Sequence, residues 1–227
     1  YAAALVEKNG FEICFIDAPA KQMSKETCLS KIKKEAADAK LFVLDTSTPS
    51  INSDLNFAEA LKAEVPNTYI VLVGTHPTAT VEETLSNGRA VNAIARKEYD
   101  YTILELAEAL NNDVPLNGIR GLSYKDNNKI INNPDREPLQ NLDEIPLAAE
   151  FIKKYLNIYD YSFPAATYPS IQIFTGRGCP ARCNYCVYPQ VMHGHIYRKR
   201  SVDNVIKEFQ YIAENFPEVK EIVLEDD

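Results

Sequence analysis

The segment from Ile171 to Cys186 reads IQIFTGRGCPARCNYC and places a short apolar run directly before three cysteines. Its first four residues, Ile171–Phe174, predict a β-strand. The cysteines then follow with the spacing CxxxCxxC. Gly176, Gly178 and Pro180 allow the tight and irregular loop that this spacing requires. The segment therefore predicts a strand whose carboxyl end carries a cysteine loop.

The residues after the loop predict a helix and a second strand. Ser201 is a good N-cap. Apolar residues then recur at intervals of three and four, the pattern of one buried helical face: Val202, Val205, Ile206, Phe209, Ile212 and Phe216. A strand is expected at Glu221–Leu224. We interpret residues 169–227 as a βαβ unit with an insertion after its first strand, as at the start of a parallel barrel whose active site lies at the strands' carboxyl ends.

The first half of the chain alternates short apolar runs with helical patterns. This alternation predicts an α/β domain with a parallel, flavodoxin-like or Rossmann-like sheet over residues 1–112. The expected strands are 12–16, 41–44, 69–73 and 91–95, and the expected helices lie at 1–7 and near 24–38, 51–63, 80–86 and 101–110. Ligands of such a sheet bind beyond the carboxyl ends of its strands, here at 17–20, 45–50, 74–79 and 96–100.

Residues 113–168 change in composition to Pro, Asn, Asp and Tyr, which marks a connector. Within it, residues 119–124 and 129–131 flank Asp126-Asn127-Asn128 and predict a hairpin. The chain opens without Met inside a helix and stops directly after a strand. We therefore expect a piece of a longer protein, cut at both ends.

Composition narrows the possible partners. The net charge of −8 and the pI near 5.0 argue against nucleic-acid binding. The one dense basic run, Arg198-Lys199-Arg200, is interpreted as a solvated loop before a helix. No stretch is long and apolar enough to cross a bilayer, and no secretory leader is visible, so we expect a cytoplasmic protein. Cys14 and Cys28 are expected to be packing residues.

The three clustered thiolates indicate a metal centre, because three unconnected buried cysteines are implausible at this density. In an iron–sulfur cube, Cys179, Cys183 and Cys186 would leave one iron without a protein ligand and open to a small molecule. The alternative is a closed Cys₃His zinc site completed by His193 or His195.

The motif resembles the signature of the radical S-adenosylmethionine (radical SAM) enzymes, which have CxxxCxxC with an aromatic residue before the last cysteine. The resemblance implies that the three cysteines bind a [4Fe-4S] cluster and that Tyr185 lies beside the adenine of S-adenosylmethionine. It also implies that the acidic end Glu225-Asp226-Asp227, with Glu225 and Asp226 as the main candidates, holds the methionine amine. An alternative is that these carboxylates fray at a cut terminus.

Nearly the whole chain resembles the cobalamin-binding branch of that family. The loop Gly74-Thr75-His76-Pro77-Thr78-Ala79 and the loop 45–49 are similar to two of its cobalamin loops, and residues 135–146 to its connector. Residues 188–201 are closest to the subgroup that includes hopanoid-biosynthesis members. The resemblance implies cobalamin contacts from the following residues: Thr46, Ser47, Gly74, Thr75, His76 and Glu98.

One segment departs from this branch. Lys97-Glu98-Tyr99-Asp100 stands where the branch has Gly-Glu-Gly-Glu, and Lys97 and Tyr99 would crowd a flat cofactor that glycine would let approach. A radical SAM oxidoreductase with a vestigial, non-binding domain is therefore an alternative. A second alternative is a receiver-like binding domain with Asp45 as phosphoacceptor, fused to a zinc site. We interpret His76 as a turn residue rather than a cobalt ligand.

The leading hypothesis is an enzyme that cleaves S-adenosylmethionine with a [4Fe-4S] cluster and begins radical chemistry on an unactivated carbon. The outcome would be cobalamin-dependent methyl transfer or, as an oxidoreductase, another radical product such as a new C–C bond. The resemblance implies a small-molecule or lipid-like substrate and a low-potential electron donor such as flavodoxin or ferredoxin. We expect the isolated piece to be inactive, because the later barrel strands that close over substrate are absent.

Overall fold

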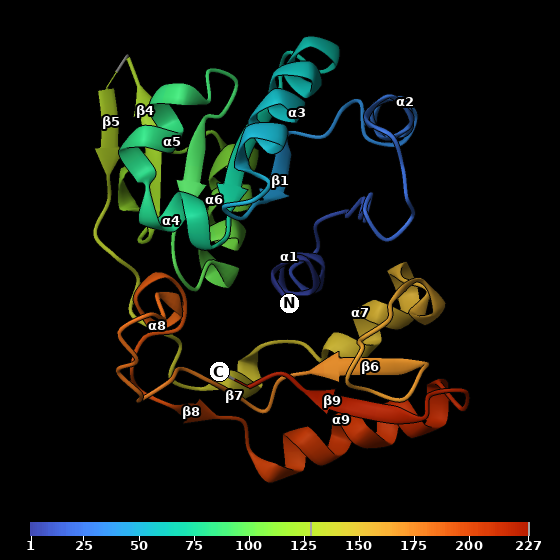
Figure 1. Cartoon of the computed structure of the whole chain (residues 1–227). Helices are drawn as coiled ribbons and strands as arrows, with labels where there is room; N and C mark the ends of the chain where they lie inside the picture. Colours follow the sequence, from blue (N-terminus) through green and yellow to red (C-terminus); the bar gives the residue numbers. More distant parts are fainter. Residues whose placement is uncertain (128, 227) are drawn as a thin grey trace.

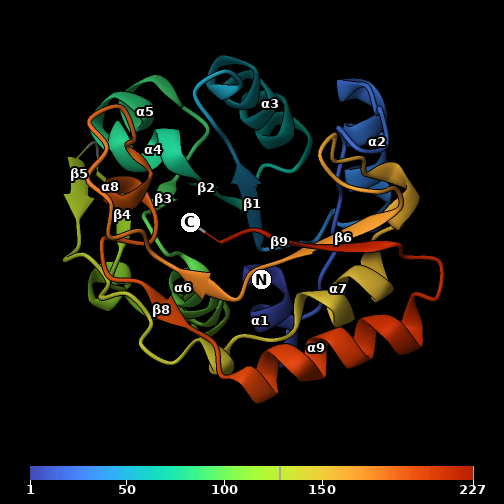
Figure 2. The same cartoon turned by 60° about the horizontal axis from the view of Figure 1, so that its bottom comes forward.

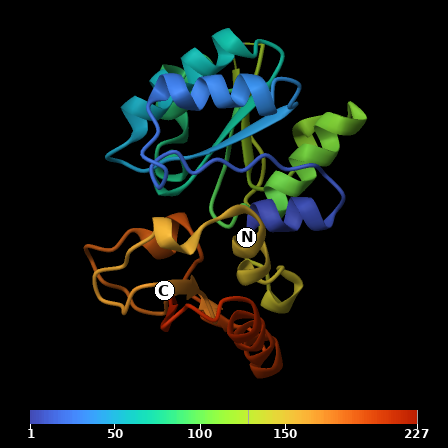
Figure 3. The same ribbon diagram turned by 90° about the vertical axis from the view of Figure 1, so that its right-hand side faces the viewer.

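The computed structural model describes residues 1–127 and 129–226. The chain forms two parts that face each other, an α/β layer built from the first half and a smaller part with two short sheets built from the second (Figure 1). Figure 3 shows the two parts stacked one above the other. Among the described residues, no helix combines the length and the apolar character needed to cross a membrane.

A five-stranded sheet organises the first part, with its strands in the order β1-β2-β3-β4-β5. The strands are β1 (Leu41–Asp45), β2 (Tyr69–Val73), β3 (Ala93–Ala95), β4 (Leu122–Asp126) and β5 (Lys129–Asn132). The first three are parallel, with Val43 opposite Val71 and Leu72 opposite Ile94. The predicted parallel α/β layer is confirmed, and the carboxyl ends of these three strands meet at one edge.

Helices cover both faces of this sheet. Alternate residues of β2 point to opposite faces, so Val71 and Val73 pack against α1 (Ala2–Lys8) and α6 (Asp100–Asn112). Ile70 and Leu72 pack on the other side, against α2 (Lys25–Glu35) and α3 (Ile51–Glu64), where α5 (Val81–Asn87) also lies. The predicted helices of this half are therefore confirmed, with one addition, α4 (Thr75–Ala79), in the loop that follows β2.

The predicted strand at 12–16 is wrong. Residues 11–17 have no regular secondary structure. A strand is stable only when a neighbour completes its hydrogen-bond ladder, and β1, at the edge of the described sheet, pairs only with β2. Cys14, expected to be a packing residue, is exposed as a result, whereas Cys28 on α2 is buried as expected.

The predicted hairpin forms and has a larger role than a connector element. Its strands β4 and β5 pair antiparallel, and β4 also pairs antiparallel with β3. The hairpin therefore extends the sheet of the first part. Arg96 secures this junction, because its guanidinium donates to the carbonyl oxygen of Asn133 at 2.7 Å and pairs with Asp135 at 2.8 Å. Asn128, at the predicted turn, lies outside the described residues.

The second part contains the predicted βαβ unit. β6 (Ser170–Ile173) pairs in parallel with β9 (Glu221–Leu224), and α9 (Val202–Asn215) connects them. Ser201 caps α9 by accepting a hydrogen bond from the Asn204 amide at 3.1 Å. α9 lies along the outer side of the two strands (Figure 2), where Ile212 and Phe216 are buried against β6.

The remaining elements connect or extend these units. The described part of the connector contributes α7 (Ala148–Tyr155), which contacts α9, and three single-turn helices. The single-turn helices are η1 (Leu116–Gly118), η2 (Leu142–Glu144) and η3 (Ile158–Asp160). The insertion between β6 and α9 holds the paired strands β7 (Gly176–Arg177) and β8 (Arg198–Lys199), with α8 (Tyr188–Val191) between them.

Candidate cofactor site

The carboxyl ends of β1 and β2 border a cavity of about 500 Å³. It is lined by Asp45, Thr46, Ser47, Ser50, Gly74, Thr75, Tyr99, Tyr188 and Met192. Asp45 ends β1, the next five residues follow β1 or β2, and Tyr188 and Met192 come from the facing part. Four of the six residues predicted to contact cobalamin, namely Thr46, Ser47, Gly74 and Thr75, therefore lie together where the fold predicts a ligand site.

Gly74 lets the two strand-end loops approach each other. Its φ of +114° lies in a region that favours glycine. A Cβ at this position would stand 2.2 Å from the carbonyl oxygen of Thr46 and 2.9 Å from Oδ1 of Asp45. No side chain can be added here without moving the loop after β1. The glycine therefore shapes one wall of the cavity.

Hydroxyl groups surround that wall. Thr46 is buried and donates to Asp54, and its hydroxyl also lies 3.4 Å from that of Ser50. The Ser47 amide donates to the Ser50 hydroxyl at 3.1 Å. Burial raises the pKa of the Asp45 carboxyl, an amide hydrogen bond from Thr46 opposes the rise, and the charge of Asp54 adds to it. The cavity thus offers hydroxyl donors and a carboxyl that protonates more readily than usual.

His76 is not among the residues that line this cavity. It lies on the short helix α4, half-buried, and its Nδ1 is 3.1 Å from the hydroxyl of Thr48. The contact joins the loops that follow β1 and β2. This position agrees with a residue that orders the turn, and the structure gives no contact by which His76 would face the cavity.

The segment after β3 leaves room for a cofactor at Lys97 but not at Tyr99. Lys97 adopts a positive φ of 58°, the backbone conformation that glycine would take at this position. Its ammonium pairs with Asp135 at 2.5 Å, and its amide donates to the Thr78 hydroxyl at 3.1 Å. Tyr99 does stand in the wall of the cavity. The lysine is thus accommodated, and Tyr99 remains the bulky residue of the segment.

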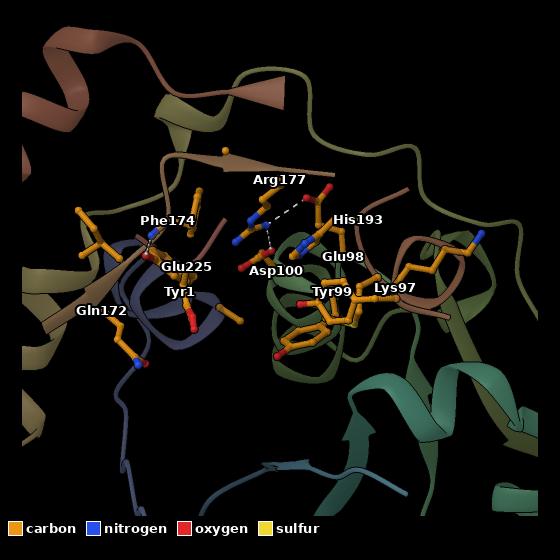
Figure 4. A pocket seen from close by; sticks show the side chains of 15 residues that line it. Tyr1, Lys97, Glu98, Tyr99, Asp100, Gln172, Phe174, Arg177, His193 and Glu225 are labelled. Carbon is orange, nitrogen blue, oxygen red and sulfur yellow. Dashed lines mark hydrogen bonds and ion pairs between the residues drawn. The ribbon is translucent and has the colours of Figure 1, made fainter. Parts of the chain in front are cut away.

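A second cavity of about 360 Å³ lies between the two parts (Figure 4). Tyr99, Tyr188 and Met192 line both cavities, so the two spaces adjoin. The other side chains come from both halves of the chain: Tyr1, Lys97, Glu98, Asp100, Gln172, Ile173, Phe174, Arg177, His193 and Glu225, with Ala2 and Gly176 completing the lining. The cavity therefore opens toward the ends of β3, β6 and β9.

Buried ion pairs cross between the parts beside this cavity. Nη1 of Arg177 lies 2.7 Å from Asp100 and 3.2 Å from Glu98. Arg198 pairs with Glu98 at 2.9 Å. Glu98, predicted to contact cobalamin, is thus engaged by two arginines of the second part. Burial alone would raise the pKa of the Asp100 carboxyl, but the charge and the hydrogen bond of Arg177 together outweigh burial and lower this pKa, so the carboxyl is ionised at neutral pH.

The interpretation of Arg198-Lys199-Arg200 as a solvated loop is wrong for both arginines. Each is 6% exposed. Arg200 donates to Glu208 at 2.5 Å and to the carbonyl oxygen of Phe174 at 2.7 Å. Sequence reasoning also missed Arg177. The available signal was that Arg177 stands between two glycines directly after a strand, at the place where a barrel enzyme has its chemistry.

The cysteine loop is anchored at its ends and open in its middle. The Cys179 amide donates to the Gly194 carbonyl oxygen at 3.1 Å, and the Cys186 amide to that of Cys183 at 3.2 Å. Cys183 is exposed, and Tyr185 is 88% exposed. Within residues 1–127 and 129–226, no three His, Cys, Asp or Glu side chains are grouped as metal ligands. The structure therefore does not bring the three predicted thiolates together, nor Tyr185 to a cavity.

The two predicted carboxylates after β9 differ. Glu225 lines the cavity between the parts (Figure 4). Asp226 instead accepts hydrogen bonds from the amides of Thr175 and Gly176 at 2.6 and 2.9 Å and from the Tyr197 hydroxyl at 3.1 Å. Burial raises the pKa of Asp226, and these hydrogen bonds outweigh it and lower the pKa. Asp226 thus secures the end of β6, and Asp227 lies outside the described residues.

Comparison with protein families identifies the first half of the chain. Residues 1–107 match the B12 binding domain. The whole chain is 31% identical over 227 residues to an uncharacterized methyltransferase of Pyrococcus horikoshii, and covers 47% of it. It is 25% identical over 218 residues to an anaerobic magnesium-protoporphyrin IX monomethyl ester cyclase of Rubrivivax gelatinosus, of which it covers 38%. The chain spans about half the length, or less, of these relatives.

Solved structures show the same fold over the full chain. The cobalamin-dependent S-adenosylmethionine radical enzyme OxsB, with aqua-cobalamin and S-adenosylmethionine bound, matches with a TM-score of 0.79 and 17% identity. The chain covers 30% of it. The radical S-adenosylmethionine methyltransferase TsrM from Kitasatospora setae, with cobalamin and a [4Fe-4S] cluster bound, matches with a TM-score of 0.74 and 15% identity, and 45% of it is covered.

These findings define the class. The chain carries a B12-binding domain and has, over its full length, the fold of cobalamin-dependent radical SAM enzymes. The resemblance drawn from the cysteine and strand-end motifs is therefore confirmed at the level of domain and fold. The assignment to the hopanoid subgroup stays a prediction.

The residues at the strand ends fit cobalamin. Gly74 provides a wall that a Cβ would fill, the hydroxyl groups of Thr46, Ser47 and Ser50 make the neighbouring wall polar, and the cavity continues into the space between the parts. The cysteine loop supplies the right donors for an iron–sulfur cluster, three thiolates on one segment, although the thiolates do not converge here. Among the described residues, the strand ends therefore form a cavity that fits cobalamin, whereas the cysteine loop does not have the geometry of a cluster site.

Proposed function

We propose that the protein from which this chain comes is a cobalamin-dependent radical SAM enzyme that transfers a methyl group to an unactivated carbon. One observation supports this most strongly: the strand-end cavity of a B12-binding domain adjoins a second cavity bordered by the part that carries CxxxCxxC. Two cofactors bound there would act on one substrate. Several relatives are methyltransferases or radical SAM enzymes, which agrees with this proposal.

Each half has a defined task in the proposal. Cys179, Cys183 and Cys186 would hold a [4Fe-4S] cluster, which would supply reductive cleavage of S-adenosylmethionine. Glu225, facing the cavity between the parts, would accept hydrogen bonds from the methionine ammonium, as charge complementarity favours. Thr46, Ser47, Gly74 and Thr75 would contact cobalamin. Enclosure between the parts would exclude water and other reactants from the radical.

The proposal also covers the source of the electron and the class of substrate. A low-potential donor such as flavodoxin or ferredoxin would provide the electron, and a reducing cytoplasm would keep the thiols free of disulfides. The substrate would be a small molecule. TsrM, one of the proteins with this fold, has been solved with tryptophan as substrate. A lipid-like substrate would follow from the hopanoid subgroup.

Anaerobic reconstitution with iron and sulfide tests the cluster half. We expect the charge-transfer absorption of a [4Fe-4S] cluster and, after reduction, a paramagnetic resonance signal that changes when S-adenosylmethionine binds the open iron. Cys183→Ala should lose both signals. Tight binding of one zinc per chain with no cluster signal would instead support the Cys₃His alternative, in which His193 or His195 completes a closed site.

A further inference from the structure

The carboxylate of Glu98 is a junction between the two parts of the molecule. It accepts hydrogen bonds from Nη1 of Arg198 at 2.9 and 3.1 Å, from Nη1 of Arg177 at 3.2 Å and from the Leu139 amide at 2.9 Å. Glu98 is 7% exposed, and the two arginines are 4% and 6% exposed. These donors to Glu98 thus act beside the cavity between the parts, largely shielded from bulk solvent.

The charges of this cluster balance only when the parts are together. Glu98 and Asp100 belong to the first part, and Arg177 and Arg198 belong to β7 and β8 of the second. If the parts shift while they remain in contact, a buried carboxylate or guanidinium group is left without its partner, which is strongly unfavourable. The cluster therefore favours one relative position of the two parts.

The cluster also stands at the base of the cysteine loop. Arg177 lies opposite Arg198 in the antiparallel register of β7 and β8. The cysteine loop connects these two strands in the sequence. Arg177 precedes Cys179 by two residues, and Nη2 of Arg198 donates to the His193 carbonyl oxygen at 2.8 Å. On the other side, Glu98 directly precedes Tyr99, which lines both cavities. The contact thus joins the base of the loop to the strand-end site.

We propose that Glu98, Asp100, Arg177 and Arg198 form an ionic clamp that fixes the distance and orientation between the cobalamin layer and the cysteine loop. Glu98 is then a positioning residue. The clamp accounts for why its carboxylate is turned to the second part. The functional meaning of the clamp, that two cofactors are held in register, rests on the proposed function.

The test measures the position of one part against the other in the whole protein without any cofactor. Spin-labelled non-canonical residues replace Ser53 on α3 and Lys207 on α9, both exposed, and pulsed dipolar spectroscopy gives their distance distribution. We expect one narrow maximum in the wild type and loss of that maximum in Glu98→Gln, whose amide keeps the shape and removes the charge. Glu208→Gln is the matched control, because Glu208 pairs with Arg200 inside the second part; it should keep the narrow maximum.

A narrow and unshifted distribution in folded Glu98→Gln would overturn the clamp. If this variant does not fold by circular dichroism, Arg198→Lys replaces it. Lysine keeps the charge and loses the fork that reaches Glu98, Leu139 and His193 together. The same loss of the maximum supports the clamp, and an unchanged maximum contradicts it.

A second measurement separates the clamp from the proposed function. In protein loaded with cob(II)alamin and reduced cluster, the dipolar interaction between the two paramagnets should have a single value in wild type and a spread of values in Glu98→Gln, with both cofactors still bound. Failure of the wild type to load either cofactor would contradict the proposed function while the spin-label result on the clamp would still stand.

Discussion

The strand-end edge and the cysteine loop face each other across the molecule and are built in opposite ways. At the strand ends, the fold itself positions the groups: Gly74 sits against the Thr46 backbone and Thr46 is buried with its hydroxyl bonded. In the loop, Cys183 and Tyr185 are exposed. Backbone packing can shape a site before its ligand arrives, whereas a loop of free cysteines has no bond that closes it until a metal centre binds the sulfur atoms.

The largest effect is expected at the loop. Cys183→Ala should abolish the cluster, because two thiolates cannot hold the cube in place, and with it all cleavage of S-adenosylmethionine. Since Cys183 is exposed, the melting temperature of the cluster-free protein should change little. Cys14→Ala, at the other exposed cysteine, is the control and should retain the full cluster signal. A cluster retained at full occupancy in Cys183→Ala would show that the loop is not its site.

A large effect is also expected at the strand ends, by way of the fold. Gly74→Val places a side chain where the Thr46 carbonyl oxygen stands, so we expect a loss of about 1–3 kcal/mol in the free energy of unfolding together with loss of cobalamin binding. Denaturant unfolding and a visible titration measure the two. Gly118→Ala is the control, because a Cβ there meets no atom within 4 Å. Wild-type cobalamin affinity in Gly74→Val would separate this edge from the cofactor.

Tyr99 is the residue that distinguishes this edge from the glycine-bearing pattern. Tyr99→Ala should join the two cavities and let cobalamin approach more closely, which we expect to tighten binding by up to about tenfold, or 1.4 kcal/mol. Tyr101→Phe on α6, two residues further on, only loses a hydroxyl contact with Glu144 at 3.2 Å and should leave the affinity unchanged. Weaker binding in Tyr99→Ala would mean that the ring packs against the cofactor.

The smallest effect concerns Asp226. Hydrogen bonds lower its pKa from the ordinary value of 3.8, so its contribution to stability is present above pH 3.8 and is lost as the pH falls through the lowered value. Because the residue is exposed, the contribution should stay below about 1 kcal/mol. Asp226→Asn should therefore show a smaller decrease in stability than the wild type between pH 5 and 2. Parallel pH profiles of the two proteins would contradict this role.

Local signals explain what the sequence could predict. The helix after Ser201 and the strands at 41–45 and 69–73 follow from capping and apolar periodicity within each segment. The strand at 12–16 failed because a strand depends on a neighbour. The ionic clamp could not be predicted, since Glu98 lies 79 residues from Arg177 and 100 from Arg198. From the sequence alone, Arg198-Lys199-Arg200 resembles a solvated run, because the carboxylate of Glu98 that pairs with Arg198 comes from a distant segment.

Titration of the protein with hydroxocobalamin tests the central claim, that the edge formed by β1, β2 and β3 holds a cofactor beside the part that carries the cysteines. We predict a shift of the visible spectrum that saturates at one cobalamin per chain and is absent in Gly74→Val. No shift, together with labelling of Asp45 by acetyl phosphate, would contradict the account and favour a receiver-like domain.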